Sequence, residues 1–193
     1  MQTTTNIKTE ALKNGLIWGV INIVIFLVTW YVAPSLMSSY WYAAFSLIIG
    51  LVLAVFFCLD MRKKVGGYWT FGEALWPIFV MFVFAMGLMF VFNILFGKFI
   101  DTTYPEQMKE MVMTKTEATM KSFGLSDEEA AKALDKTREN LDQQFTPTFS
   151  QAVMAFGISA IMYFIGALIF ALIFKRSNPN PFSGQNDPNF GAN

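Results

Sequence analysis

Few residues in this chain could do enzymatic chemistry. The sequence contains no histidine and a single cysteine, Cys58. Histidine is the commonest general base and metal ligand, and Ser–His or Cys–His nucleophiles depend on it. The sequence also contains no phosphate-binding glycine loop, no serine-hydrolase motif and no zinc-protease motif. It therefore predicts a protein that is not an enzyme and that uses neither a cofactor nor a metal ion.

Two asparagines, Asn22 and Asn93, lie within long apolar segments. If these segments cross a membrane, each amide needs a hydrogen-bond partner, because lipid supplies none. Asn22 falls about 10 Å from one end of its segment at 1.5 Å per residue, whereas Asn93 lies close to the opposite membrane edge. The two amides are therefore too far apart in depth to bond each other. An interhelical hydrogen bond for each is the favoured interpretation, and a polar pathway is the alternative.

Charged residues lie at the ends of the apolar segments, and none lies in the middle of one. Proton relays and ion-coupled sites usually contain intramembrane charges, so this pattern argues against them. Glu73 opens the third segment, where its charge suits the positive end of the helix dipole. Asp60 closes the second and is predicted to be neutralised by Arg62, Lys63 or Lys64. We interpret these residues as interfacial anchors, with the basic trio as a candidate site for anionic lipid.

The elements that position these residues are four long apolar segments. They cover residues 15–33, 40–59, 74–97 and 151–174. A bilayer core of about 30 Å needs about 20 apolar residues of helix to cross it. Charged residues form only 15% of the chain, against about 25% in soluble domains. The predicted fold class is therefore an all-α integral membrane protein with four transmembrane helices.

Small residues recur at four-residue intervals on two of the predicted spans. Gly15 and Gly19 form such a pair in the first span, and Ser46, Gly50 and Ala54 form a stripe in the second. Small side chains allow two helix backbones to approach closely. Packing between helices of this chain is the favoured interpretation, and homodimerisation is the alternative.

The distribution of lysine and arginine predicts the orientation of the spans. Basic residues gather in the N-terminal tail 1–14, in the loop 60–73 and directly after the fourth span, so both termini are predicted to be cytoplasmic. The tail 175–193 is rich in Asn, Pro and Gly and is predicted to be disordered. Aromatic residues predict two interfacial belts, formed by Trp30, Tyr31, Tyr40, Trp41 and Tyr42 on the outer side and by Tyr68, Trp69 and Trp76 on the inner side.

The connection between the third and fourth spans, residues 99–150, is long and charged. Pro105 suits the first position of a helix, and Gly124 suits the position after the end of one. Ser126 and Glu129 form a capping box at the start of a second helix. These signals predict an extracytoplasmic helical hairpin. Its apolar faces are expected to meet each other or the spans, with docking of a partner protein as the alternative.

Three short motifs in a fixed order resemble a known family. They are Asn14-Gly15-Leu16-Ile17-Trp18-Gly19 at the start of the first span, Tyr68-Trp69-Thr70-Phe71-Gly72-Glu73-Ala74 before the third, and Asp101, Tyr104, Pro105 and Glu106 after it. With the methionine-rich insert and the final Lys175-Arg176, they resemble the Bacteroidota membrane proteins that share domain of unknown function 4199, over residues 8–176. The resemblance implies a four-helix inner-membrane protein and no particular activity.

The leading functional hypothesis is a non-enzymatic structural or accessory subunit of a bacterial inner membrane, which acts through helix packing and the hairpin. The alternative is an oligomeric channel or small-solute transporter lined by Asn22, Asn93 and Ser159. The expected partners are the lipid bilayer, anionic lipid at the basic loop, and a second copy or another protein at the hairpin. The formal net charge is zero, so no nucleic-acid partner is expected.

Overall fold

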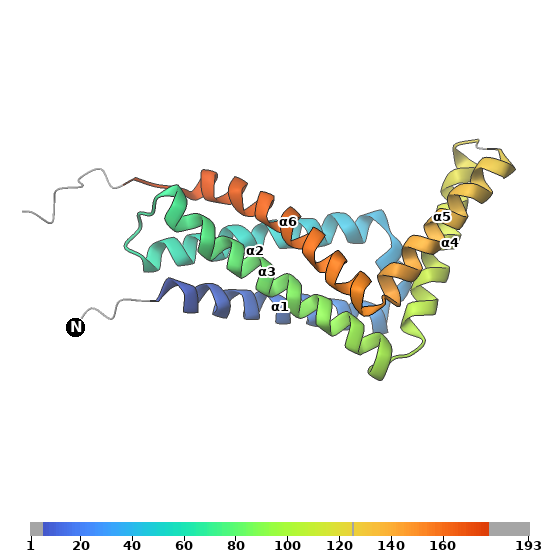
Figure 1. The fold of residues 1–193 in the computed structure, drawn as a ribbon, viewed down its shortest axis with the longest axis horizontal. Coiled ribbons are helices and arrows are strands. Elements are labelled where there is room, and N and C mark those ends of the chain that lie inside the picture. Colours follow the sequence, from blue (N-terminus) through green and yellow to red (C-terminus); the bar gives the residue numbers. More distant parts are fainter. Residues whose placement is uncertain (1–5, 125, 178–193) are drawn as a thin grey trace, which may run out of the picture.

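The computed structural model describes residues 6–124 and 126–177, and over these residues the chain forms six α-helices. Four long helices lie along the long axis of the molecule (Figure 1): α1 (Ile7–Val32), α2 (Tyr40–Lys64), α3 (Phe71–Leu95) and α6 (Phe149–Phe174). The shorter helices α4 (Tyr104–Ser122) and α5 (Asp127–Phe145) project from one end of this bundle. The predicted disorder of the C-terminal tail concerns residues that lie mostly outside the described part.

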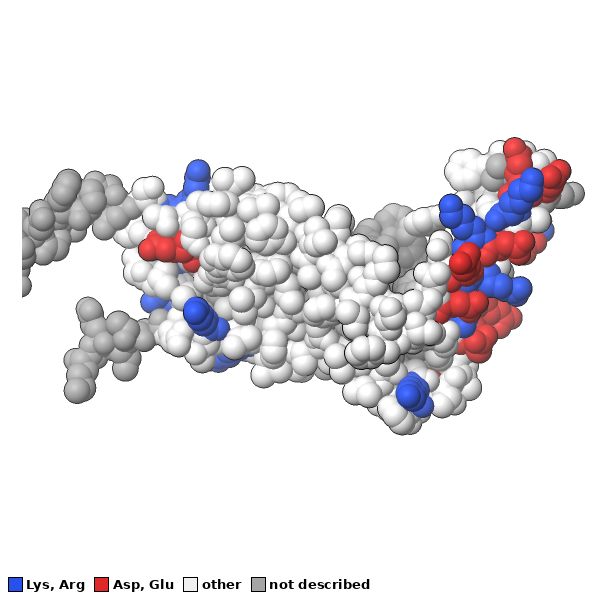
Figure 2. Space-filling view, viewed as in Figure 1, with Lys and Arg blue, Asp and Glu red and all other residues white. Residues whose placement is uncertain are grey.

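The four long helices are each long and apolar enough to cross a membrane, as the sequence predicts. The shortest has 25 residues, which at 1.5 Å per residue span about 38 Å. Figure 2 shows the consequence on one face: charged side chains gather at the two ends, and the long middle is free of them. The four apolar helices therefore indicate an integral membrane protein.

Helix α1 begins before its apolar segment. It starts at Ile7, because the side chain of Asn6 caps it by accepting a hydrogen bond from the backbone N–H of Lys8 at 3.1 Å. The predicted polar tail 1–14 is therefore helical from Ile7 onward. The first charged residues of the chain are carried on a helical extension of the span, which fixes their positions relative to α2.

Two further turns complete the described chain. A 3-10 turn, η1 (Pro34–Ser38), joins α1 to α2 and contains the proline that ends the first helix. Helix α3 continues into a π-helical turn, η2 (Phe96–Ile100), before the chain leaves the bundle towards α4. We call the end of the bundle that carries Ile7, loop 65–70 and Arg176 the basic end, and the pair α4–α5 the arm.

Close packing in the bundle is concentrated on α3, which contacts α1 on one side and α6 on the other. A Cβ atom added at Gly15 would lie 2.8 Å from the backbone oxygen of Met81, and one added at Gly19 would lie 2.8 Å from Leu88. Gly15 therefore allows α1 and α3 to approach within a distance that no larger residue permits, because it faces a backbone atom, whereas Gly19 faces the flexible end of the Leu88 side chain.

Helix α2 is attached differently. Its buried residues, Ala54, Phe57, Cys58 and Met61, all belong to its second half, near the basic end. The first half of α2 exposes its large apolar side chains, and α2 makes little contact with α6. Helix α2 is therefore held at the basic end and stands apart from α6 at the other.

The close contact between α1 and α3 gives a direct test. Replacing Gly15 by alanine places a methyl group against the Met81 carbonyl, and overpacking of this kind costs about 1–3 kcal/mol. We expect a lower thermal unfolding midpoint in detergent. Gly157→Ala in α6 is the matched control, since nothing lies within 4 Å of a Cβ at that position. Equal midpoints for the two variants would contradict the packing described.

Candidate functional site

An ion-pair network ties α1 to α2 at the basic end. The ammonium of Lys64 lies 2.7 Å from Asp60 Oδ2 and 2.6 Å from Glu10 Oε2. The buried side chain of Asn14 donates a hydrogen bond from Nδ2 to the same Asp60 oxygen at 3.4 Å. Lys64 is thus the member of the basic trio that neutralises Asp60. The network holds the two helices together where α2 is best packed.

The end of α6 is held by the loop between α2 and α3. The carbonyl oxygen of Phe174 accepts hydrogen bonds from Trp69 Nε1 at 2.8 Å and from Arg62 Nη1 at 3.5 Å. The backbones of Trp69 and Arg176 also exchange two hydrogen bonds, of 3.1 and 2.9 Å. The last carbonyls of a helix have no partner within the helix, so these bonds satisfy groups that would otherwise be costly. The interpretation of Trp69 as a belt residue is wrong, because the side chain is only 3% exposed.

Glu73 and Lys63 take no part in the ion-pair network at the basic end. The Glu73 carboxylate accepts a hydrogen bond from the Thr70 backbone N–H at 2.7 Å and completes a capping box at the start of α3. In the described residues, Lys63 makes no ion pair, whereas Lys64 and Arg62 are committed to protein contacts. Lys63 is therefore the exposed member of the basic trio that has no ion pair or hydrogen bond with another described side chain.

At the other end, the turn before α4 is bound to α1. Trp30 Nε1 donates to Asp101 Oδ2 at 2.8 Å, and the Thr103 hydroxyl donates to Asp101 Oδ1 at 2.6 Å. The hydrogen bonds from Thr103 first, and then from Trp30, lower the pKa of Asp101. Trp30 is 5% exposed, so its interpretation as a belt residue is also wrong; Trp41, at 86%, fits that description.

Tyr104, the first residue of α4, is buried in an aromatic cluster. Its ring lies 5.4 Å from Phe26, 5.0 Å from Trp30, 5.4 Å from Phe96 and 5.7 Å from Phe145, measured between centroids. All four contacts are edge-on, the arrangement that aromatic quadrupoles prefer. Burial raises the pKa of Tyr104 to about 12. Aromatic rings of α1, η2 and α5 therefore surround Tyr104 and hold the start of α4 against the bundle.

Helices α4 and α5 lie antiparallel in the arm. Lys109 of α4 pairs with Asp142 of α5 at 2.7 Å, and its pKa is raised chiefly by that hydrogen bond. The predicted capping box of Ser126 and Glu129 is present at the start of α5. Gly124 follows the end of α4 with a φ of +70°, a conformation that glycine adopts without steric cost. The predicted capping box and the glycine after α4 are therefore confirmed, whereas Pro105 is the second residue of α4 and not the first.

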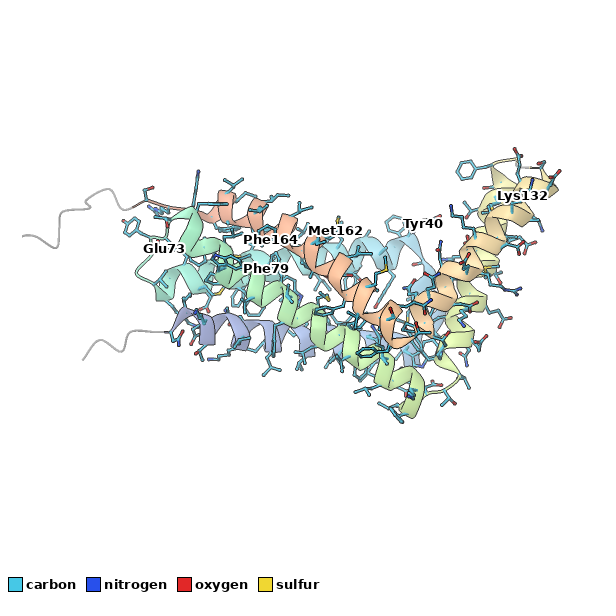
Figure 3. The ribbon with its side chains drawn as sticks, in the orientation of Figure 1. Tyr40, Glu73, Phe79, Lys132, Met162 and Phe164 are labelled. Carbon is cyan, nitrogen blue, oxygen red and sulfur yellow. The ribbon has the colours of Figure 1, made fainter. Side chains whose placement is uncertain are left out.

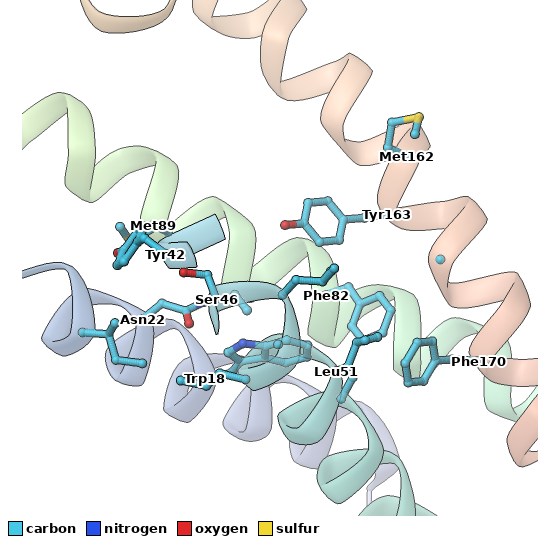
Figure 4. Close-up of a pocket in the computed structure, with 17 residues that line it drawn as sticks. Trp18, Asn22, Tyr42, Ser46, Leu51, Phe82, Met89, Met162, Tyr163 and Phe170 are labelled. Atoms are coloured by element: carbon cyan, nitrogen blue, oxygen red, sulfur yellow. The ribbon is translucent and has the colours of Figure 1, made fainter. Parts of the chain in front are cut away.

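The two intramembrane asparagines do not meet, and neither has the predicted interhelical bond to a described residue. Asn93 has a buried Oδ1 for which the described chain offers no hydrogen-bond partner. Asn22 lines a cavity of about 690 Å³ between α1, α2, α3 and α6. Ser46, Gly50 and Ala54 line the same cavity, whereas Asn93 and Ser159 do not. Figure 4 shows Asn22, Ser46 and Tyr163 around it.

The described residues offer no metal centre. Over residues 6–124 and 126–177, no group of three or more cysteine, aspartate or glutamate side chains is placed to hold a metal ion. The structure instead provides an uncharged cavity within the membrane-spanning bundle and two polar networks at its ends. Trp30, Trp69 and Asn14 belong to these networks. In the sequence, Asn14 and Trp69 stand out as members of the family motifs, and Trp30 and Trp69 as aromatics at the ends of apolar segments.

The bond between Trp30 and Asp101 gives a pH-dependent prediction. The ordinary pKa of aspartate is about 3.9, and that of Asp101 is lowered in the folded chain. A lowered carboxyl pKa stabilises the fold above the ordinary value, and this contribution is lost as the pH falls through the lowered value. We expect the unfolding midpoint in detergent to drop as the pH falls below about 4, and Asp101→Asn to show a smaller drop.

Trp30→Phe tests the hydrogen bond when it is compared with a second buried tryptophan. The variant keeps an aromatic ring next to Tyr104 but removes the N–H and part of the buried ring, so we expect a loss of about 2–3 kcal/mol at neutral pH. Trp18→Phe is the matched control, because Trp18 is also buried and its side chain makes no hydrogen bond with the described residues. If both variants unfold at the same temperature, the hydrogen bond does not stabilise the junction.

Comparison with known proteins gives one match. No curated protein and no solved structure matches the chain. A family model described as "Protein of unknown function (DUF4199)" matches residues 13–176. This region includes the four long helices from the second turn of α1 onward, the arm and both polar networks except Glu10. The match covers far more than half of the sequence, and the chain therefore belongs to the DUF4199 family.

Proposed function

We propose that this protein is a non-enzymatic accessory subunit of a bacterial inner membrane, which presents its arm to a partner protein outside the cytoplasm. The observation that carries the proposal is the anchoring of the arm. Tyr104 is buried among aromatic rings, and Asp101 is bound by Trp30, so α4 leaves the bundle at a fixed angle. Figure 3 shows the arm, with Lys132 on it, extending beyond the end of the spans.

The surface of the arm supports a role in binding. Charged side chains of both signs cover the face seen in Figure 2. Phe123, at the turn between the two helices, is 78% exposed, and Arg138 is exposed on α5. Aromatic residues and arginine are enriched among the residues that contribute most to protein interfaces. The arm therefore combines a fixed position with the side chains that protein interfaces use.

The proposed orientation follows from the two ends of the bundle. Arg62, Lys63, Lys64 and Arg176 lie at the basic end, and the arm lies at the opposite end. Cytoplasmic loops carry an excess of lysine and arginine, so we assign the basic end to the cytoplasm. At this end Lys63 is the side chain that would hold an anionic lipid headgroup.

A channel or transporter is the weaker alternative. Its predicted lining was Asn22, Asn93 and Ser159, and the cavity reaches only the first of these. In the described part of a single chain, this cavity thus gives no continuous polar lining from one end of the bundle to the other. A channel would have to be built between several copies of the chain.

Cysteine labelling tests the orientation. Lys8→Cys places a thiol at the basic end and Lys136→Cys places one on the arm, both at exposed positions. Cys58 is fully buried, so the unsubstituted chain serves as the unlabelled control. With an impermeant maleimide on intact spheroplasts, we expect labelling at position 136 and none at position 8 until the membrane is opened. The reverse pattern would refute the orientation.

Capture from membranes in mild detergent tests the role of the arm. We expect a tagged full-length chain to retain partner proteins that are lost when residues 104–146 are replaced by a short glycine–serine linker. Because that deletion exposes Trp30 and Phe26, a second variant, Phe123→Ser with Arg138→Ser, changes only exposed side chains. Lys8→Ser at the opposite end is the control. Identical captured proteins for all four chains would rule out the proposal.

A further inference from the structure

We propose that the cavity between α2 and α6 binds one neutral lipid, with a single uncharged hydroxyl or carbonyl head and one apolar tail. Its volume of about 690 Å³ lies within the range of about 300–1,000 Å³ that holds small ligands in proteins. The cavity lies within the four-helix bundle, apart from the arm. The inference concerns a binding site that is independent of the function proposed for the arm.

Unsatisfied polar groups are the first reason. Trp18, Asn22, Ser46 and Tyr163 contribute side chains to the cavity wall, and none of them makes a side-chain hydrogen bond with another described residue. Lipid tails offer neither donors nor acceptors, so a polar group left without a partner at this depth is unfavourable. Asn22 and Ser46 can each both donate and accept. They provide the partners that a hydroxyl or carbonyl group requires.

The absence of charge is the second reason. Among the side chains that line the cavity there is no aspartate, glutamate, lysine or arginine. A phosphate or carboxylate placed there would be a buried ion without a counter-charge, which is strongly unfavourable. The electrostatics of the site therefore select a neutral head over the charged headgroup of a phospholipid or a fatty acid.

The depth of the polar groups agrees with this selection. Ser46 is the seventh residue of α2, which starts at Tyr40, so its Cα lies about 9 Å along the helix from that end. The head of the ligand would thus lie below the level of the lipid headgroups. The rest of the wall is apolar and includes Leu51, Phe82 and Phe170, which suits a hydrocarbon tail (Figure 4).

The attachment of α2 provides the entrance. This helix is buried only in its second half and makes little contact with α6, so the cavity opens between them towards the bilayer. The small residues of α2 border empty space here: a Cβ at Gly50 would have its nearest neighbour, Trp18, at 4.0 Å. A lipid can therefore enter sideways from the membrane, without passing through water.

Photolabelling of the full-length chain in vesicles tests the site. The probes are a long-chain alcohol and the fatty acid of equal length, each with a diazirine in the tail. We expect the alcohol to label peptides of α2 and α6, and the fatty acid to label them at least about tenfold less at pH 8. Equal labelling by the two probes would overturn the neutral-head assignment.

Substitutions distinguish the cavity from the lipid-facing surface. Gly50→Leu fills the empty space and should abolish labelling by the alcohol, whereas Gly157→Leu, which faces open space on α6, should leave it unchanged. Asn22→Leu should reduce labelling about fivefold to tenfold, the effect of losing one net hydrogen bond. Asn22→Leu also provides a readout if Gly50→Leu fails to fold. Labelling that neither Gly50→Leu nor Asn22→Leu reduces would show that the alcohol contacts only the lipid-facing surface, and it would overturn the proposal.

Discussion

The lack of hydrogen-bonding partners in a bilayer is the constraint on which this structure depends. Every polar group within the spans must find a partner in the protein, in bound water or in a ligand. The chain meets this demand at most positions: the Thr29 hydroxyl bonds the Ile25 carbonyl at 2.8 Å, and Trp69 bonds the end of α6. Among the described residues, the side chains without such a partner include Asn93, Ser159 and the polar groups that line the cavity. The cavity is the place where several of these groups lie together.

The four-helix bundle is open beside α2, because different interactions hold its two ends together. At the basic end, Lys64 joins α1 to α2, and Trp69 joins the α2–α3 loop to α6. At the other end, the rings around Tyr104 join α1, η2, α4 and α5, but no residue of α2 belongs to this buried aromatic cluster. Helix α2 is therefore buried only in its second half; its start is held through η1, where Lys115 of α4 donates to the Ser38 carbonyl at 2.9 Å. The cavity lies mainly along the first half of α2.

The sequence predicts the helices and caps that depend on neighbouring residues. It does not predict hydrogen bonds between residues that lie far apart in the chain. The four spans follow from length and composition, and the start of α5 follows from Ser126 and Glu129, three residues apart. Trp30 and Trp69 both look like interfacial aromatics, yet each donates to a group 71 or 105 residues away in the sequence. No local pattern identifies such a partner, because the contact exists only once the helices have packed.

The small residues also show that a local sequence pattern does not determine how closely two helices pack. Gly15 and Gly50 lie in similar four-residue patterns, but a Cβ at Gly15 would lie 2.8 Å from a backbone atom, and one at Gly50 would lie 4.0 Å from its nearest neighbour. A small side chain permits close approach without causing it, so the same pattern allows a helix contact in α1 and a cavity in α2.

The cavity and the base of the arm are neighbours in the bundle, although they are proposed to serve different functions. Met89 lines the cavity and also packs against the aromatic cluster that holds Tyr104. Tyr42 lines the cavity from α2, and its hydroxyl contributes, after burial, to the raised pKa of Tyr104. Met89 of α3 and Tyr42 of α2 are thus the side chains that lie between the membrane-facing cavity and the base of the arm. The two sites are separated by one layer of side chains, because the same residues border both.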